Sequence, residues 1–282
     1  AGLAYEIYSD IKPNPTIENV QTGVAAFKAS GADYIIAIGG GSSMDTAKAV
    51  GIIITNPEFA DVRSLEGVAP TKKPCVPIIA VPTTAGTAAE VTINYVITDV
   101  EKKRKFVCVD THDIPVIAVI DPDMMASMPK GLTAATGMDA LTHAIEAYVS
   151  TLNSPFTDPL AIKAIEMVFD YLPQSYKKDM DAREQMHYAQ CLAGQAFSNA
   201  LLGIVHSMAH KTGAAFSTGH IPHGCANAIY LPYVIKYNAH EPEAMRRYAD
   251  IARRVGLGGT SEKAQVNALI EKIEEFNLSL IH

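Results

Sequence analysis

The stretch YIIAIGGGSSMDTAKAV, residues 34–50, decides the fold class of this chain. It begins as an apolar, β-branched run, passes through three glycines and two serines, and continues as a helical pattern. Glycines let a ligand approach the backbone closely, and the first N–H groups of a helix favour phosphate. The stretch fits neither GxGxxG, because Met44 takes the place of the last glycine, nor a P-loop, which needs GK[ST]. It therefore predicts either a phosphate-binding strand–helix turn or a plain tight turn in which Ser42 or Ser43 caps the helix.

Similar apolar runs follow at 77–81 (PIIAV) and 116–120 (VIAVI). Because these runs are nearly all apolar, they predict parallel strands covered on both faces. A helix is expected from residue 43 to about residue 55, and two strand-like runs around a polar turn at 91–110 favour an antiparallel hairpin. The alternation predicts an α/β sheet domain with right-handed crossovers over residues 1–130.

The pattern changes after residue 130. Strand-like runs stop, and alanine-rich segments with apolar residues near i, i+3, i+4 and i+7 take over. The clearest helical segments are 131–150, 158–172, 182–202 and 242–255. A chain of 282 residues is long enough for two cores, so we expect a second, all-helical domain over 131–282.

Composition excludes several classes of function. The net charge is −7 and no Lys/Arg cluster is interleaved with aromatic residues, which argues against a nucleic-acid surface. No apolar stretch approaches 18 residues, so no membrane span is expected. The four cysteines are widely separated without a CxxC pair, which is typical of reduced, buried cysteines in a cytoplasmic protein. The chain starts without Met and stops within a helical pattern, so we expect it to lack elements at both ends.

A second loop rich in hydroxyl groups follows the next strand, in AVPTTAGTAAEVT (80–92), where Thr83, Thr84 and Thr87 surround a glycine. Open α/β sheets bind ligands at the carboxyl ends of their strands, so two such loops at adjacent strands would share one crevice. Together they predict a nucleotide site. Lys105 on the hairpin is either a cation for phosphate or ribose or simply a solvated lysine.

Histidines and one aspartate form the third group. Asp139 and His143 lie four apart on a predicted helix and so project from one face, and His206 and His210 repeat that spacing on a later helix. Two facing helices and the PHG turn would bring together Asp139, His143, His206 and His223, an O,N,N,N set suited to Fe²⁺ or Zn²⁺. Taken alone, the first pair could equally be a helix-surface carboxylate and a satisfied core histidine.

The chain as a whole resembles the iron-containing (group III) alcohol dehydrogenase family. The resemblance rests on PNPT (13–16), GADYIIAIGGGSSMDTAK (31–48), PTTAGTAAEVTINYVITD (82–99), ATGMDALTHAIEAY (135–148), HSMAHKTGA (206–214) and IPHGCANAI (221–229). It implies a dinucleotide-binding domain and a helical metal domain of dehydroquinate synthase-like architecture, with the active site in the cleft between them. The implied reaction is hydride transfer between NAD(H) and a small primary alcohol or aldehyde, such as 1,2-propanediol and lactaldehyde, with the metal as Lewis acid. It also implies a homodimer.

Residue by residue, the resemblance assigns three sets of roles. The cofactor contacts are Asn14, Gly40, Gly41, Ser42, Thr83, Thr84, Thr87, Asn94 and Lys105. The metal ligands are Asp139, His143, His206 and His223. His210 matches the histidine near the nicotinamide, where it either relays the alcohol proton or only orients a ligand.

One departure affects the fourth ligand. His223 follows His206 by seventeen positions, whereas the family usually has fourteen, and three extra residues within 217–219 put His220 near the usual count. The neighbouring Pro222 and Gly224 give His223 the family's local context. Whether the metal is iron or zinc stays open, and NAD rather than NADP rests on similarity alone. The alternatives are a zinc glycerol dehydrogenase, a dehydroquinate synthase-like enzyme, or a non-catalytic metal-binding fragment.

Overall fold

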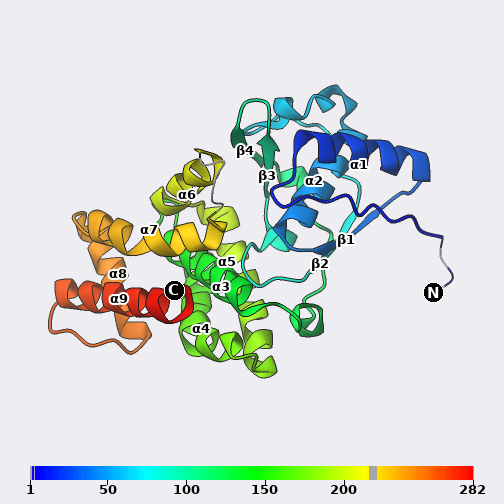
Figure 1. The fold of residues 1–282 in the computed structure, drawn as a ribbon. Helices are drawn as coiled ribbons and strands as arrows, with labels where there is room; N and C mark the ends of the chain where they lie inside the picture. The colour runs from blue at the N-terminus through cyan, green and yellow to red at the C-terminus, as the bar shows by residue number, and fades with distance from the viewer. Residues whose placement is uncertain (1, 3, 216–220, 282) are drawn as a thin grey trace. The chain divides into compact units, whose positions relative to one another are not determined.

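The computed structural model describes residues 2, 4–215 and 221–281 (Figure 1). The chain divides into two units. Unit 1 comprises Ala1–Thr83 and Ala89–Asp121, and unit 2 comprises Thr84–Ala88 and Pro122–His282. The threonine-containing loop at 80–92 thus has residues in both units. The predicted domain boundary at residue 130 stays a prediction.

Unit 1 is built on a small parallel sheet. Its regular elements are α1 (Ile17–Ser30), β1 (Ile35–Gly39), α2 (Gly41–Thr55), β2 (Ile78–Pro82), β3 (Asn94–Asp99), β4 (Arg104–Val109) and β5 (Ile117–Ala118). Short 3₁₀ turns occupy Pro57–Phe59, Val62–Leu65, Ala89–Val91 and Thr111–Asp113. The parallel sheet has the order β1-β2-β5, while β3 and β4 form an antiparallel hairpin, with Val96 opposite Val107. The predicted α/β class and hairpin are therefore confirmed, although the third strand shrinks from five residues to two.

The turn after β1 differs from the serine-capped alternative. Helix α2 begins at Gly41 with Gly40 as N-cap and has no side-chain cap among the described residues. Ser42 instead accepts a hydrogen bond on Oγ from the backbone N–H of Asn14, at 3.2 Å. Gly39 has φ of 148°, and a Cβ there would lie 2.3 Å from Oγ of Ser43, so only glycine fits. Both serines therefore lie within the first turn of α2, and neither occupies the N-cap position.

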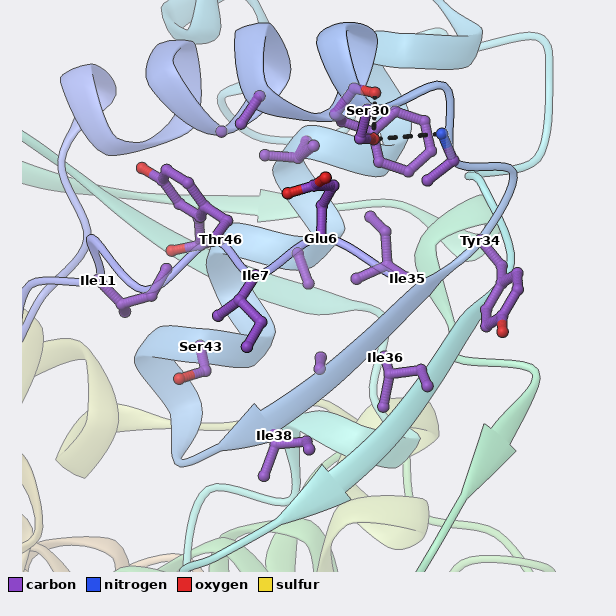
Figure 2. A pocket seen from close by; sticks show the side chains of 18 of the residues that line it. Glu6, Ile7, Ile11, Ser30, Tyr34, Ile35, Ile36, Ile38, Ser43 and Thr46 are labelled. Carbon is purple, nitrogen blue, oxygen red and sulfur yellow. Dashed lines mark hydrogen bonds between the residues drawn. The ribbon is translucent and has the colours of Figure 1, made fainter. Parts of the chain in front are cut away.

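Strand β1 also departs from the expected pattern. It lies at the edge of the sheet, and Ile36 and Ile38 are 52% and 56% exposed, so the described residues do not cover this strand on both faces. Figure 2 shows the two side chains beside an apolar hollow of about 540 Å³, which Ile7, Ser43 and other residues also line. The apolar run did predict a strand correctly, but not how completely it is buried.

A buried ion pair lies below α2. Lys48 is completely buried, with Nζ 3.6 Å from a carboxylate oxygen of Asp113 and 3.0 Å from the carbonyl oxygen of Asn94, to which it donates. On the same helix, Asp45 accepts a hydrogen bond from the backbone N–H of Val96 at 3.1 Å. Polar groups of α2 thus tie the helix to the hairpin, alongside the apolar core.

These carboxylates predict a pH dependence of stability. Burial raises the pKa of Asp45 from 3.8 to about 7 against the attraction of Lys48 and Lys105, and burial also raises the pKa of Asp113 to about 7. Because the folded pKa lies above the unfolded one, their stabilising contribution is complete below pH 4 and is lost as the pH rises through 7. Asp45→Asn should therefore gain stability relative to the parent between pH 4 and 8, by about 1 kcal/mol or more, since a tenfold change in proton affinity is worth about 1.4 kcal/mol.

Urea unfolding at several pH values measures this difference. Exposed Asp33→Asn is the matched control and should follow the parent at every pH. A difference between Asp45→Asn and the parent that stays constant from pH 4 to 8 would contradict the prediction.

Unit 2 is helical. Its helices are α3 (Lys130–Val149), α4 (Asp158–Tyr176), α5 (Met180–Ala200), α6 (Ile204–Ala215), α7 (His223–Asn238), α8 (Pro242–Arg254) and α9 (Glu262–Phe276), with a 3₁₀ turn at Pro122–Met125 and a π turn at Asn277–Ile281. Helix α3 is its centre, because every residue from Thr133 to Tyr148 is buried and α4, α5 and α7 pack around it. No helix in the described part of the chain is both long and apolar enough to cross a membrane.

Two features of unit 2 were predicted incompletely. The PHG segment is not a turn: His223 is the first residue of α7, with Pro222 as N-cap. The four cysteines are free thiols as expected, but only Cys108 is buried and the other three are half-buried.

Candidate metal centre and cofactor-binding residues

A buried cluster of three side chains lies in unit 2. Asp139 and His143 are one turn apart on α3, and His206 comes from the first turn of α6. One ligand atom from each lies within 4.8 Å of the other two, and all three residues are buried. The i, i+4 spacing on α3 therefore places an oxygen and a nitrogen ligand beside a nitrogen from a second helix.

His223 adds a fourth donor from the start of α7. The Nε2 atoms of His206, His223 and His143 lie 3.5, 3.7 and 4.0 Å from Oδ1 of Asp139. Tetrahedral ligand atoms bound at about 2.1 Å from a metal lie about 3.4 Å from one another. Each of the three histidine nitrogens is therefore near the separation from the Asp139 oxygen that a small divalent cation requires.

Hydrogen bonds on the far side of two imidazoles set their tautomers. Nδ1 of His143 lies 3.2 Å from the carbonyl oxygen of Gly86, and Nδ1 of His206 lies 2.6 Å from Oε2 of Glu146. Because a carbonyl and a carboxylate only accept, both Nδ1 atoms carry the proton, and each Nε2 faces Asp139. His143 also stacks on Phe197, with ring centroids 4.2 Å apart, which fixes the plane of the ring.

The side chain of Asn227 contacts three of these ligand atoms. Its Nδ2 donates to Oδ1 of Asp139 at 2.7 Å and also lies 3.1 Å from Nε2 of His206 and 3.3 Å from Nε2 of His223. An amide has two hydrogens, so Nδ2 can donate to at most two of these three atoms. These ligand atoms thus face one place, and the residues fit a divalent cation with oxygen and nitrogen ligands.

The electrostatics of the cluster agree with a cation site. Burial disfavours the charged form of Asp139, yet the three surrounding histidines hold the pKa of this carboxyl well below its usual range. Burial lowers the pKa of His143 to about 3, so its imidazole is neutral at pH 7. Burial also opposes the charged form of His206, but hydrogen bonds with Asp139 and Glu146 raise its pKa to about 9. A bound cation competes with the proton on Nε2 of His206.

His210 lies beside the cluster, one turn after His206 on α6. Its ring centroid is 4.9 Å from that of His223 and 6.3 Å from that of His206. The residues that raised doubt about the fourth ligand, His220 and residues 217–219, lie outside the described residues.

The cofactor residues predicted in unit 1 lie largely together. Nζ of Lys105 donates to Oδ1 of Asn14 at 2.7 Å, and the backbone N–H of Asn14 donates to Ser42 in the first turn of α2. The backbone N–H of Thr83 donates to the carbonyl oxygen of Gly39 at 2.9 Å, so the two loops meet at the ends of β1 and β2. Helix α2 begins at Gly41, directly after β1, so its first backbone N–H groups lie at the carboxyl end of that strand.

The remaining predicted cofactor residues are less closely joined to this group. Oδ1 of Asn94 is buried without a hydrogen-bond partner among the residues that the structure describes. Thr84 and Thr87 belong to unit 2.

Sequence reasoning missed two residues that contact the cluster. Glu146 lies seven residues after Asp139 on α3, and Asn227 lies four residues after His223 on α7. Residues four or seven apart lie on the same face of a helix. The helical period could therefore have indicated both residues from the positions of the predicted ligands.

Comparison with protein families matches both parts of the chain. A family model described as "Iron-containing alcohol dehydrogenase" matches residues 1–122, and one described as "Fe-containing alcohol dehydrogenase family, C-terminal" matches residues 133–281.

Among curated proteins, lactaldehyde reductase of Escherichia coli (strain K12) is 58% identical over 280 residues, covering 98% of this chain and 72% of the relative. An NADPH-dependent butanol dehydrogenase of Clostridium saccharobutylicum is 52% identical, covering 98% of this chain and 70% of the relative.

Solved structures agree. A 1,3-propanediol oxidoreductase superposes with a TM-score of 0.91 at 41% identity, covering 98% of this chain and 71% of that one. A sulfoacetaldehyde reductase from Bifidobacterium kashiwanohense, in complex with NAD⁺, gives 0.83 at 32% identity and covers 96% and 69%.

Proposed function

Because the chain belongs to the iron-containing alcohol dehydrogenase family, we propose that it transfers a hydride between NAD(H) and a small primary alcohol or aldehyde. The observation that carries the proposal is the convergence of an aspartate and three histidines in unit 2 of a chain that both family models match. The matches do not support a glycerol dehydrogenase, a dehydroquinate synthase-like enzyme or a non-catalytic fragment.

Lactaldehyde and 1,2-propanediol are the substrate pair that we propose. Their support is the 58% identity to a lactaldehyde reductase, which exceeds the identity to the butanol dehydrogenase. NAD(H) is the proposed dinucleotide, supported by the NAD⁺ complex of a structural relative.

Asp139, His143, His206 and His223 are the residues that would hold Fe²⁺, or Zn²⁺ in its place. When bound, the metal supplies Lewis acidity at the aldehyde oxygen, and the reduced nicotinamide supplies the hydride. Gly86 keeps the proton of His143 on Nδ1, and Phe197 holds its ring. His210 would deliver a proton from a ring nitrogen to the product oxygen during reduction.

The cofactor would lie against the amino end of α2, where Gly40, Gly41 and Ser42 offer backbone N–H groups to the pyrophosphate. Lys105, Asn14 and Asn94 would contact the remainder of the dinucleotide, together with Thr83, Thr84 and Thr87. The contacts among Asn14, Ser42 and Lys105 support this assignment, because they hold the three side chains at one place.

We also propose that the protein works as a cytoplasmic homodimer. The four free thiols support a reducing compartment. The dimer rests on family resemblance, and sedimentation measures it.

An anaerobic assay tests the proposed function. Protein loaded with Fe²⁺ is given NADH and a panel of lactaldehyde, propionaldehyde, butyraldehyde and dihydroxyacetone, and NADH absorbance is followed. NADH oxidation fastest with lactaldehyde is the expected result. No oxidation with any aldehyde, from protein that retains its metal, would refute the dehydrogenase, and a preference for dihydroxyacetone would favour the glycerol dehydrogenase alternative.

His210→Gln tests the proton relay. It should lower kcat by about 10²-fold, in the range typical of a lost general acid, and change the pH profile of kcat, while metal content is unchanged. His240→Gln is the matched control, since His240 lies just after α7 and pairs with the nearby carbonyl of Tyr237. If His210→Gln instead loses metal and keeps the parent's pH profile, His210 only orients a ligand.

A further inference from the structure

We propose that Glu146 is a positioning residue that prepares His206 for the metal by fixing both its tautomer and the helix that carries it. The proposal rests on the proposed function, because it concerns the same metal site. It extends the role of Glu146 from the hydrogen bond with His206 to the backbone at the start of α6.

The two carboxylate oxygens of Glu146 contact different groups at the start of α6. Oε2 accepts from Nδ1 of His206 at 2.6 Å, and Oε1 accepts from the backbone N–H of Val205 at 2.7 Å. Glu146 is 5% exposed, so both contacts are made away from water. One side chain of α3 therefore holds both the ring of His206 and the backbone of the preceding residue, Val205.

The chain just before α6 makes room for this carboxylate. A Cβ at Gly203 would lie 3.0 Å from Oε1 of Glu146, closer than ordinary van der Waals contact. The absence of a side chain at this position lets the start of α6 approach the carboxylate closely. The arrangement thus depends on residues from two segments.

The chemistry requires a carboxylate and not merely a polar group. Both partners of Glu146 are N–H donors, and an ionised carboxylate only accepts. A glutamine places its NH₂ against one of them. Turned toward Val205, the amide meets a donor it cannot pair with. Turned toward His206, it donates to Nδ1, moves the ring proton to Nε2 and removes the lone pair that faces Asp139.

Metal affinity is the first readout. Zn²⁺ affinity is measured by competition with a chromophoric chelator for the parent, Glu146→Gln and Glu146→Asp. Glu146→Gln should bind Zn²⁺ 10- to 100-fold more weakly, as expected when the carboxylate behind a ligating histidine is lost. Glu146→Asp keeps an acceptor-only group and should lose less. Asp250→Asn is the matched control, because Asp250 accepts from Tyr148, also on α3, and should leave the affinity unchanged.

A spectroscopic readout separates positioning from simple bracing of α3 against α6. In the Zn²⁺-loaded parent labelled with ¹⁵N-histidine, His206 should show a slowly exchanging, far-downfield Nδ1–H proton, which Glu146→Gln should lack. The spectrum of the parent tests the proposal even if Glu146→Gln does not fold. A parent in which Nδ1 of His206 carries no proton would overturn the proposal, as would equal Zn²⁺ affinity in the parent and Glu146→Gln. A parent that binds no Zn²⁺ or Fe²⁺ at all would instead refute the proposed metal site.

Discussion

His206→Ala should abolish metal binding and lower aldehyde reduction by roughly 10³-fold or more, because Lewis-acid stabilisation is worth several kcal/mol and each 1.4 kcal/mol is a factor of ten. The substitution removes an Nε2 donor that lies 3.5 Å from Oδ1 of Asp139. It also leaves the buried carboxylate of Glu146 without its imidazole partner, and an unpaired buried charge is strongly unfavourable. The imidazole of His206 lies between the carboxylates of Asp139 and Glu146, and the substitution removes it from both.

Two measurements on one anaerobic preparation check this result: iron content by elemental analysis, and NADH oxidation with lactaldehyde. His240→Ala is the matched control, since His240 contacts the carbonyl of Tyr237 and should keep both metal and activity. Circular dichroism confirms that the variant is folded. Full metal content together with parental turnover in His206→Ala would contradict the metal-site assignment.

Local sequence signals predicted the strand–turn–helix unit at 34–50 well, because glycine spacing and apolar runs act over a few residues. Side-chain partners were harder to predict. Ser42 was an alternative N-cap, yet its Oγ accepts from Asn14, which comes from a distant part of the chain. The helix begins one residue earlier, with Gly40 as N-cap, so Ser42 lies inside its first turn and its hydroxyl binds a partner that only the folded chain supplies.

Helix α7 shows a second limit. Pro232 lies within it and Pro222 just before it, and its apolar residues do not gather on one side. A segment of this kind lacks the amphipathic stripe by which helices are recognised, so the PHG residues were read as a turn. His223 was nevertheless chosen over His220 from its neighbours, and the structure places its Nε2 3.7 Å from Asp139.

Glu146 was missed for a different reason. In HAIEAY it reads as a charged residue within an apolar helix, and sequence alone does not show that every face of α3 is covered. Once α3 is buried all round, a carboxylate there needs partners, and the start of α6 provides them. The helical period could locate this residue, but only the packing of α6 could show what it contacts.

Gly224→Ala should be among the most damaging substitutions of a small residue in unit 2, lowering the free energy of unfolding by about 3 kcal/mol or more. A Cβ at this position would lie 1.9 Å from the carbonyl oxygen of Ala135 and 3.2 Å from Cβ of Asp139. The first obstacle is backbone of a buried helix, which cannot turn aside as a flexible side chain does. The start of α7 must therefore move away from α3, and His223 and Asn227 move with it. Urea unfolding measures the stability, and chelator competition measures the accompanying loss of metal affinity.

Gly131→Ala provides the matched control, because a Cβ at this residue, in the first turn of α3, meets nothing within 4 Å. Alanine there restricts the unfolded chain without a clash, so it should be neutral or stabilising by up to about 1 kcal/mol. The two variants make the same chemical change, and no positive φ is involved at either glycine. Their difference consequently measures the close approach of α7 to α3, on which the position of His223 depends. Equal stability of the two variants would show that α7 can move away from α3 without loss of stability. Packing would then not hold His223 in place.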